Sequence, residues 1–199
     1  MTADHLPEAT PPYTQGAEKL LAAASDLFYR EGIHAVGVDT VAAAAGVTKK
    51  TLYDRFGSKD SLVVAYLRGR DARWRDGLER ELEEEPAGSL DRILAIFDIS
   101  QRWSIGNGSR GCSAINARAE TGDPDNPIAV EAVRQKKWLR SVLEQLCEEA
   151  GLVDAAAVAN SLFLLYEGAL VTTGMGTFAD PFNSARETAR MILDAAQVR

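Results

Sequence analysis

The chain has few of the residue types on which metal and redox sites depend. Its 199 residues include two histidines, His5 and His34, and two cysteines, Cys112 and Cys147. The spacing of the cysteines matches no metal or redox motif. No glycine-rich phosphate loop and no pairing of a nucleophile with a base is visible. We therefore expect no enzymatic activity, no cofactor and no metal.

The sequence also lacks the features of a secreted or membrane protein. Residues 1–16 contain neither an apolar run nor a basic flank, so we expect no secretory signal. The apolar stretch 155–179 is long enough to span a bilayer. Its one charge is Glu167, near the middle, where a charge costs roughly 2.5–3.5 kcal/mol. We expect instead a buried or interface helix, in a cytoplasmic protein without a membrane partner.

Positive charge is scarce overall but concentrated in one segment. The net charge of −7 argues against nucleic acid as a partner. Residues 40–75, however, hold eight basic and three acidic side chains, a surplus of five. A local basic patch suits contact with phosphates, although a solvated helix face carrying ordinary arginines explains this segment equally well.

The apolar residues recur at helical spacing, and no segment alternates with a period of two for long enough to form a strand. The pattern predicts an all-α protein of about nine helices, with three divisions. They are a mobile N-terminal arm at 1–15, a three-helix domain at 16–58, and a larger helical domain at 59–199; the motif and the resemblance described below imply DNA binding for the second, and ligand binding and dimerisation for the third.

Residues 36–62 carry the most informative motif. They predict two short helices separated by a tight turn at Gly46, which is the geometry of a helix-turn-helix. Ala42 and Ala45 are small enough for the two helices to approach closely. Thr48 is a suitable cap for the second helix, whose first turn meets base edges in this docking mode.

The residues that follow Thr48 along the second helix have side chains of the types that contact DNA. Lysine donates to guanine O6 and N7, and threonine meets base edges. Tyr53 suits a phosphate contact, and Lys59 opens the next helix, whose N-terminal N–H groups form a phosphate site. Each residue alone is equally compatible with a solvated or core position. The candidate contacts to double-stranded operator DNA are Thr40, Thr48, Lys49, Lys50, Thr51, Tyr53 and Lys59.

The run T-V-A-x-x-A-G-V-T-K-K-T-L-Y-x-x-F-x-S-K-x-x-L, from Thr40 to Leu62, closely resembles the signature of TetR/AcrR-type regulators. The resemblance covers about residues 15–65. It implies a nine-helix, Ω-shaped homodimer that represses transcription and leaves its palindromic operator when a small molecule binds the C-terminal domain. One departure is Gly37, where the family usually has serine or threonine, so any phosphate contact there must come from the backbone.

Dimerisation through the last two helices is implied by the resemblance and supported by the residues. Positions 155–176 are apolar on nearly all sides, and small residues such as Ala159 and Gly168 permit close helix approach. A two-fold, four-helix interface would bury this surface. Such a dimer would present two recognition helices to two DNA half-sites that lie ~34–36 Å apart or somewhat further. The alternative is a central core helix in a monomer.

The ligand-binding residues are the least constrained prediction. Aromatic and polar side chains of the C-terminal half are candidates for a mostly apolar cavity, but each also suits the core or an interface. A carboxylate in so apolar a segment needs a partner, either an arginine of another helix or a cationic ligand. The candidates are Phe97, Trp103, Asn116, Trp138, Phe163, Tyr166 and Glu167, with Met175.

Three alternatives to a ligand-released repressor stay open. Cys112 follows a glycine loop beside Arg110, where a lowered pKa would make it a redox or electrophile sensor; the alternative is a small buried apolar residue. The motif would also fit a helical sensor or interaction protein that no longer binds specific DNA. Activation instead of repression depends on where the operator lies.

Overall fold

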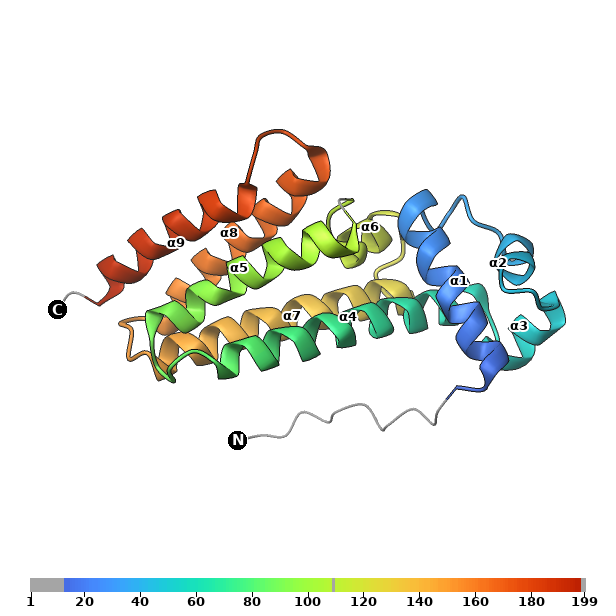
Figure 1. The fold of residues 1–199 in the computed structure, drawn as a ribbon, viewed down its shortest axis with the longest axis horizontal. Coiled ribbons are helices and arrows are strands. Elements are labelled where there is room, and N and C mark those ends of the chain that lie inside the picture. Colours follow the sequence, from blue (N-terminus) through green and yellow to red (C-terminus); the bar gives the residue numbers. More distant parts are fainter. Residues whose placement is uncertain (1–12, 109, 198–199) are drawn as a thin grey trace. The chain divides into compact units, whose positions relative to one another are not determined.

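The computed structural model describes residues 13–108 and 110–197. Most of the predicted N-terminal arm, residues 1–12, lies outside the described residues. The described chain is all-α, as predicted, and Figure 1 shows its helices. They are α1 (Gln15–Glu31), α2 (Val38–Ala44), α3 (Lys49–Phe56), α4 (Lys59–Glu83), α5 (Leu90–Asn107), α6 (Ser113–Ala119), α7 (Pro127–Glu149), α8 (Ala155–Met175) and α9 (Pro181–Ala196).

The chain forms two compact units, the first ending at Tyr66 and the second beginning at Leu67. Helix α4 therefore supplies its first eight residues to one unit and the rest to the other. In the first unit, α1, α2 and α3 contact one another. Their apolar faces meet in a small core, in which the rings of Phe28 and Tyr66 pack with centroids 5.9 Å apart. This core holds the two short helices in place.

The second unit is a bundle in which α8 packs against α7 and α9, α9 against α5, and α6 against α7. Its helix starts follow from local chemistry. The Ser89 hydroxyl accepts a hydrogen bond from the Arg92 backbone N–H at 3.2 Å. The Asn126 side chain accepts one from Ile128 N–H at 2.8 Å, ahead of Pro127 in the first turn of α7. Both are caps of the ordinary kind.

A network of ion pairs joins α4 to α7 inside the second unit. The buried carboxylate of Glu131 accepts from Arg68 Nε at 3.0 Å and from Arg134 NH2 at 2.7 Å. Arg134 also reaches Asp71 Oδ2 at 3.1 Å, and Arg75 lies 2.8 Å from the same oxygen. The network links two helices that line the cavity described below.

Helix α8 is the one described helix long and apolar enough to cross a membrane, a test that core helices of soluble proteins also pass. It lies between α7 and α9 in contact with both. Its packing is one-sided, because Ala159 and Leu162 are fully buried whereas Leu164 is 71% exposed and Met175 is 72% exposed. The second unit by itself therefore leaves an apolar face of α8 uncovered.

Candidate DNA-binding surface and ligand cavity

The first turn of α3 is shaped by its cap and by the turn before it. Thr48 Oγ1 accepts a hydrogen bond from the Thr51 backbone N–H at 3.1 Å. Thr48 therefore caps the N-terminus of α3, as predicted. Gly46 adopts φ +66°, in the left-handed region that glycine enters without strain. Leu52 is fully buried and anchors the inner side of α3. The turn and the anchor together determine which side chains of α3 face solvent.

The outer face of α3 carries the predicted DNA contacts. Lys49, Lys50 and Tyr53 are exposed, and the Lys50 side chain is 82% accessible. Thr40, on α2, is exposed as well, whereas Thr51 and Lys59 are half-buried. Ser58 Oγ accepts from Ser61 N–H at 3.0 Å and so caps the start of α4 beside Lys59. Thr48, Lys49 and Lys50 lie at the N-terminal end of α3, and Lys59 lies at the N-terminal end of α4. Backbone N–H groups at such helix ends favour phosphate.

Both lysines at the start of α3 are paired with acids. Lys49 Nζ lies 3.0 Å from Asp39 Oδ2 on α2, and this hydrogen bond raises the pKa of Lys49. Lys50 Nζ lies 2.7 Å from Asp54 Oδ2, one turn further along α3. These pairs are exposed, and such pairs contribute little to stability. They are therefore readily exchanged for contacts with phosphates or bases.

The basic residues of segment 40–75 are divided between the two units. The segment's four arginines beyond Tyr66 belong to the second unit. Arg68 and Arg75 are engaged with Glu131 and Asp71, and Arg70 donates to the Asn107 carbonyl at 3.0 Å. The basic residues of this segment in the first unit are Lys49, Lys50, Arg55 and Lys59.

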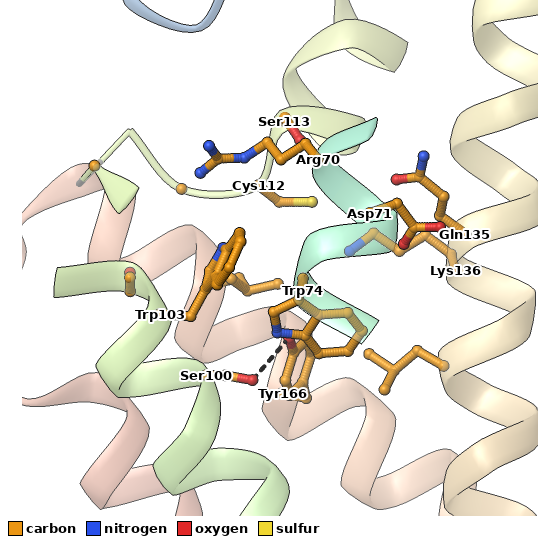
Figure 2. Close-up of a pocket in the computed structure, with 15 residues that line it drawn as sticks. Arg70, Asp71, Trp74, Ser100, Trp103, Cys112, Ser113, Gln135, Lys136 and Tyr166 are labelled. Atoms are coloured by element: carbon orange, nitrogen blue, oxygen red, sulfur yellow. Dashed lines mark hydrogen bonds between the residues drawn. The ribbon is translucent and has the colours of Figure 1, made fainter. Parts of the chain in front are cut away.

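The second unit encloses a small cavity of about 80 Å³. It lies among α4, α5, α7, α8 and the loop before α6, and Figure 2 shows the side chains that line it. Ser100 donates to the Tyr166 hydroxyl at 3.1 Å, and the rings of Trp74 and Tyr166 lie 6.4 Å apart. Burial raises the pKa of Tyr166, so its hydroxyl is neutral. We call this space the Trp74–Tyr166 cavity.

Cys112 and Lys136 face each other across the Trp74–Tyr166 cavity (Figure 2). Lys136 Nζ donates to Glu167 Oε1 at 2.8 Å. Burial lowers the pKa of Lys136, but the nearby Cys112 sulfur and the Glu167 carboxylate outweigh that effect and raise it. The ammonium is therefore charged. Within the described residues, the partner of Glu167 is thus a lysine of α7 instead of the predicted arginine.

The structure brings some of the predicted ligand-binding residues together and separates others. Trp103 and Tyr166 line the cavity, and Glu167 reaches it through Lys136. Phe97 is buried behind Tyr166, with ring centroids 6.2 Å apart. The remaining candidates lie elsewhere. The Asn116 amide donates to the Arg110 carbonyl. The Trp138 ring lies under the Arg75 guanidinium, with Cζ 3.7 Å from the ring centroid. Phe163 lines a separate groove, and Met175 is exposed.

Sequence reasoning missed several residues of the cavity wall, above all Arg70, Trp74 and Lys136. Arg70 and Trp74 lie one turn apart on α4, a spacing that places two side chains on the same face. This spacing is visible in the sequence, but it does not indicate which other helix Arg70 and Trp74 would face. Within the described residues, no cluster of three histidine, cysteine or acidic side chains is arranged to hold a metal ion.

A capped helix-turn-helix joined to a helical body with its own cavity defines the class of DNA-binding regulators that carry a separate sensing domain. Residues 20–66 match the model of the bacterial regulatory proteins of the tetR family. The chain belongs to the TetR family of transcriptional regulators.

Comparisons over most of the chain agree. A TetR-family transcriptional regulator from Streptomyces coelicolor has a TM-score of 0.85 and 28% identity, covering 92% of this chain and 97% of that one. A TetR-type protein from Streptomyces avermitilis has a TM-score of 0.78 and 30% identity, covering 92% and 99%. The HTH-type transcriptional repressor NemR of Escherichia coli is 29% identical over 132 residues, 66% of each chain.

Proposed function

We propose that this protein is a ligand-responsive transcriptional repressor. It binds a palindromic operator in the cytoplasm as a homodimer, through the exposed face of α3, and leaves the DNA when a small molecule occupies the Trp74–Tyr166 cavity. The observation that carries the proposal is the capped start of α3, from which Lys49, Lys50 and, one turn on, Tyr53 face solvent. NemR, a relative of this chain, is described as a repressor.

The uncovered apolar residues of α8 and α9 support the homodimer. Leu164 on α8 and Met191 on α9 are both more than half exposed, and the two helices pack together. Exposed apolar faces of this kind mark interfaces. A two-fold axis through α8 and α9 would bury the same face of each copy, and would present two α3 helices to two half-sites.

The composition of the Trp74–Tyr166 cavity supports a small effector. Its volume of about 80 Å³ is well below the ~300–1,000 Å³ of pockets for drug-sized ligands. The wall combines the indoles of Trp74 and Trp103 with the hydroxyls of Ser100 and Tyr166. We infer an effector of a few heavy atoms with an apolar part and one polar group.

Fluorescence anisotropy on DNA fragments from around the gene, at several salt concentrations, tests the DNA-binding half of the proposal. We expect nanomolar binding to one fragment, with an even number of protomers, and a steep fall of affinity with salt. Lys50→Ala combined with Tyr53→Ala should remove the preference for that fragment. Arg102→Ala, an exposed change on α5, serves as the control and should bind as the unmodified protein does.

Weak binding that is equal on all fragments and unchanged in the double variant would contradict the proposal. The helix-turn-helix would then serve only as a fold element, in a protein that senses or binds partners without specific DNA. If a fragment does bind, release of that DNA by candidate compounds tests the effector half. Reporter expression with and without the gene separates repression from activation.

A second candidate function uses Cys112 as a covalent sensor, and the observation that favours it is its position. Its thiol lines the Trp74–Tyr166 cavity, as does the Lys136 ammonium (Figure 2). Reactive cysteines lie in electropositive, partly accessible surroundings of this kind. Addition of the sulfur to the β-carbon of an α,β-unsaturated carbonyl would form one C–S bond, and the α-carbon would take up a proton.

Mass spectrometry after brief treatment with N-ethylmaleimide tests this second function. We expect modification of Cys112 and not of Cys147, because Cys147 is fully buried and burial raises its pKa to about 11. Modified protein should then release the operator, whereas treated Cys112→Ser should keep it. Equal labelling of both cysteines, or retention of DNA by the modified protein, would rule out thiol sensing.

A further inference from the structure

A second cavity of the second unit lies among α6, α7 and α8 and has no part in the function proposed above. Its volume of about 510 Å³ falls within the range of small-molecule sites. Its apolar lining consists of Ala114, Ile115, Ala119, Ala132, Val133 and Phe163. We call this space the α6–α7 groove.

Every charged side chain that lines the α6–α7 groove is a cation. The four are Arg118, Lys136, Lys137 and Arg140. Two of them are neutralised by acids outside the lining. Lys136 Nζ lies 2.8 Å from Glu167, and Arg140 NH1 lies 3.3 Å from Glu144 while its Nε donates to Asn160.

The other two cations, Arg118 of α6 and Lys137 of α7, form no ion pair with a carboxylate in the part of the chain that the structure describes. The Arg118 guanidinium donates to the Thr121 carbonyl, which carries no net charge, and Lys137 is exposed. The lining of an apolar groove therefore includes two positive charges without a carboxylate partner, in a chain whose net charge is −7. The complementary ligand has an apolar body and an anionic head.

We propose that the α6–α7 groove binds an amphipathic carboxylate of the unbranched alkanoate class. Its chain would lie against Val133 and Phe163, where burial of apolar surface supplies affinity. Its carboxylate would be held by Arg118 and Lys137, which supply orientation and specificity for the anion. The proposal does not depend on operator binding or on an effector in the Trp74–Tyr166 cavity.

The α6–α7 groove shares one residue with the Trp74–Tyr166 cavity. Lys136 lines both spaces, and its ammonium is held by Glu167 at 2.8 Å. A carboxylate near Lys136 on the groove side would compete with Glu167 for that ammonium. Occupancy of the groove therefore has a direct physical route to the wall that carries Cys112.

Isothermal titration calorimetry of the full chain with decanoate tests the proposal. We expect one decanoate per chain, and at least about tenfold weaker binding by Arg118→Ala combined with Lys137→Ala. Arg102→Ala removes one positive charge elsewhere in the same unit, and Arg118→Ala and Lys137→Ala alone each remove one from the groove; the Arg102 variant should leave the affinity unchanged, whereas each single groove variant should weaken it. Decyltrimethylammonium, with the same chain and the opposite charge, should bind at least about tenfold more weakly than decanoate.

A second variant separates the groove from other apolar surfaces. Val133→Trp, at a position that is 44% exposed, should fill the groove and abolish decanoate binding. If that variant does not fold, Arg118→Glu combined with Lys137→Glu, both in the groove lining, should reverse the preference between decanoate and decyltrimethylammonium.

Three results would overturn the proposal. One is decanoate binding that is unaffected by the loss of both charges, and another is equal affinity for the anionic and cationic amphiphiles. The third is decanoate binding that is seen only in protein made monomeric by Leu164→Glu. That result would mean that a second copy of the chain covers the groove in the dimer.

Discussion

At the scale of single residues, Asp54 limits the positive charge that α3 presents. Its carboxylate lies 2.7 Å from Lys50 Nζ. Asp54→Asn frees that ammonium and removes a negative charge from the DNA-facing helix. We expect affinity for DNA to rise about threefold to tenfold at low salt, and the gain to disappear as salt screens the interaction.

Anisotropy titrations at several salt concentrations measure this effect. Asp26→Asn breaks an exposed ion pair on α1 and serves as the control, with a smaller expected gain. Weaker binding by Asp54→Asn would contradict the prediction and would mean that Asp54 orients Lys50 for its contact.

Glu131 is the residue whose charge matters most to the pairing of α4 with α7. Burial alone would raise the pKa of Glu131, but hydrogen bonds from Arg134, Gln135 and Arg68 outweigh it and hold the pKa below its usual 4.5. A lowered pKa means that the ionised carboxylate stabilises the fold above pH ~4.5 and that this contribution is lost as the pH falls through the folded-state pKa.

Glu131→Gln should therefore lower the free energy of unfolding by about 1–3 kcal/mol at pH 7. The difference from the unmodified protein should shrink below pH ~4.5. Urea unfolding at several pH values measures it. Glu81→Gln, which breaks an exposed pair with Arg102, should change stability by less than about 1 kcal/mol. A Glu131→Gln difference that is constant with pH would show that the charge plays no part.

At the scale of elements, the loop before α6 is held against α8 by two glycines. A Cβ at Gly174 would lie 3.1 Å from Gly111 Cα, and a Cβ at Gly111 would lie 3.1 Å from the Leu170 carbonyl oxygen. Gly111 also adopts φ +73°, which favours glycine. The loop that carries Cys112 therefore approaches the α8 backbone as closely as two glycines allow.

Gly174→Ala should push this loop away from α8. We expect a loss of about 1–3 kcal/mol in unfolding free energy and a changed rate of Cys112 alkylation. Gly168→Ala is the matched control on the same helix, where nothing lies within 4 Å of an added Cβ. It should stabilise α8 by roughly 0.5–1 kcal/mol. Equal stability of the two variants in thermal unfolding would show that the close approach is not maintained in solution.

At the scale of the whole molecule, the uncovered faces of α8 and α9 determine the expected assembly. Leu164→Glu places a charge where the proposed interface would exclude water. We expect a monomer by light scattering and a loss of operator affinity of at least about a hundredfold, because two half-sites would no longer be bound together. Ile105→Glu, on an exposed side chain of α5, should stay dimeric. A dimeric Leu164→Glu would place the interface elsewhere.

The all-α class and the helix-turn-helix were predictable because their signals are local. The cap at Thr48, the turn at Gly46 and the buried side of α3 depend on residues within a few positions of one another. The comparisons confirm the family to which this motif belongs. The individual DNA contacts stay a prediction.

The surplus of positive charge shows the limit of counting along the chain. Half of the basic residues in segment 40–75 belong to the second unit. Arg68 and Arg75 lie 3.0 Å and 2.8 Å from Glu131 and Asp71. Charges that are neighbours in sequence are separated when a long helix such as α4 carries them from one unit into the next.

The helices, the cap at Thr48 and the helix-turn-helix motif follow from the amino-acid sequence, because helical periodicity and capping act over a few residues. Which side chains share a cavity depends on how the helices pack. Trp74, Cys112 and Tyr166 meet from three parts of the chain, and the lysine that pairs with Glu167 lies 31 positions away. Periodicity indicates which side of a helix is buried, but packing decides which helix it meets.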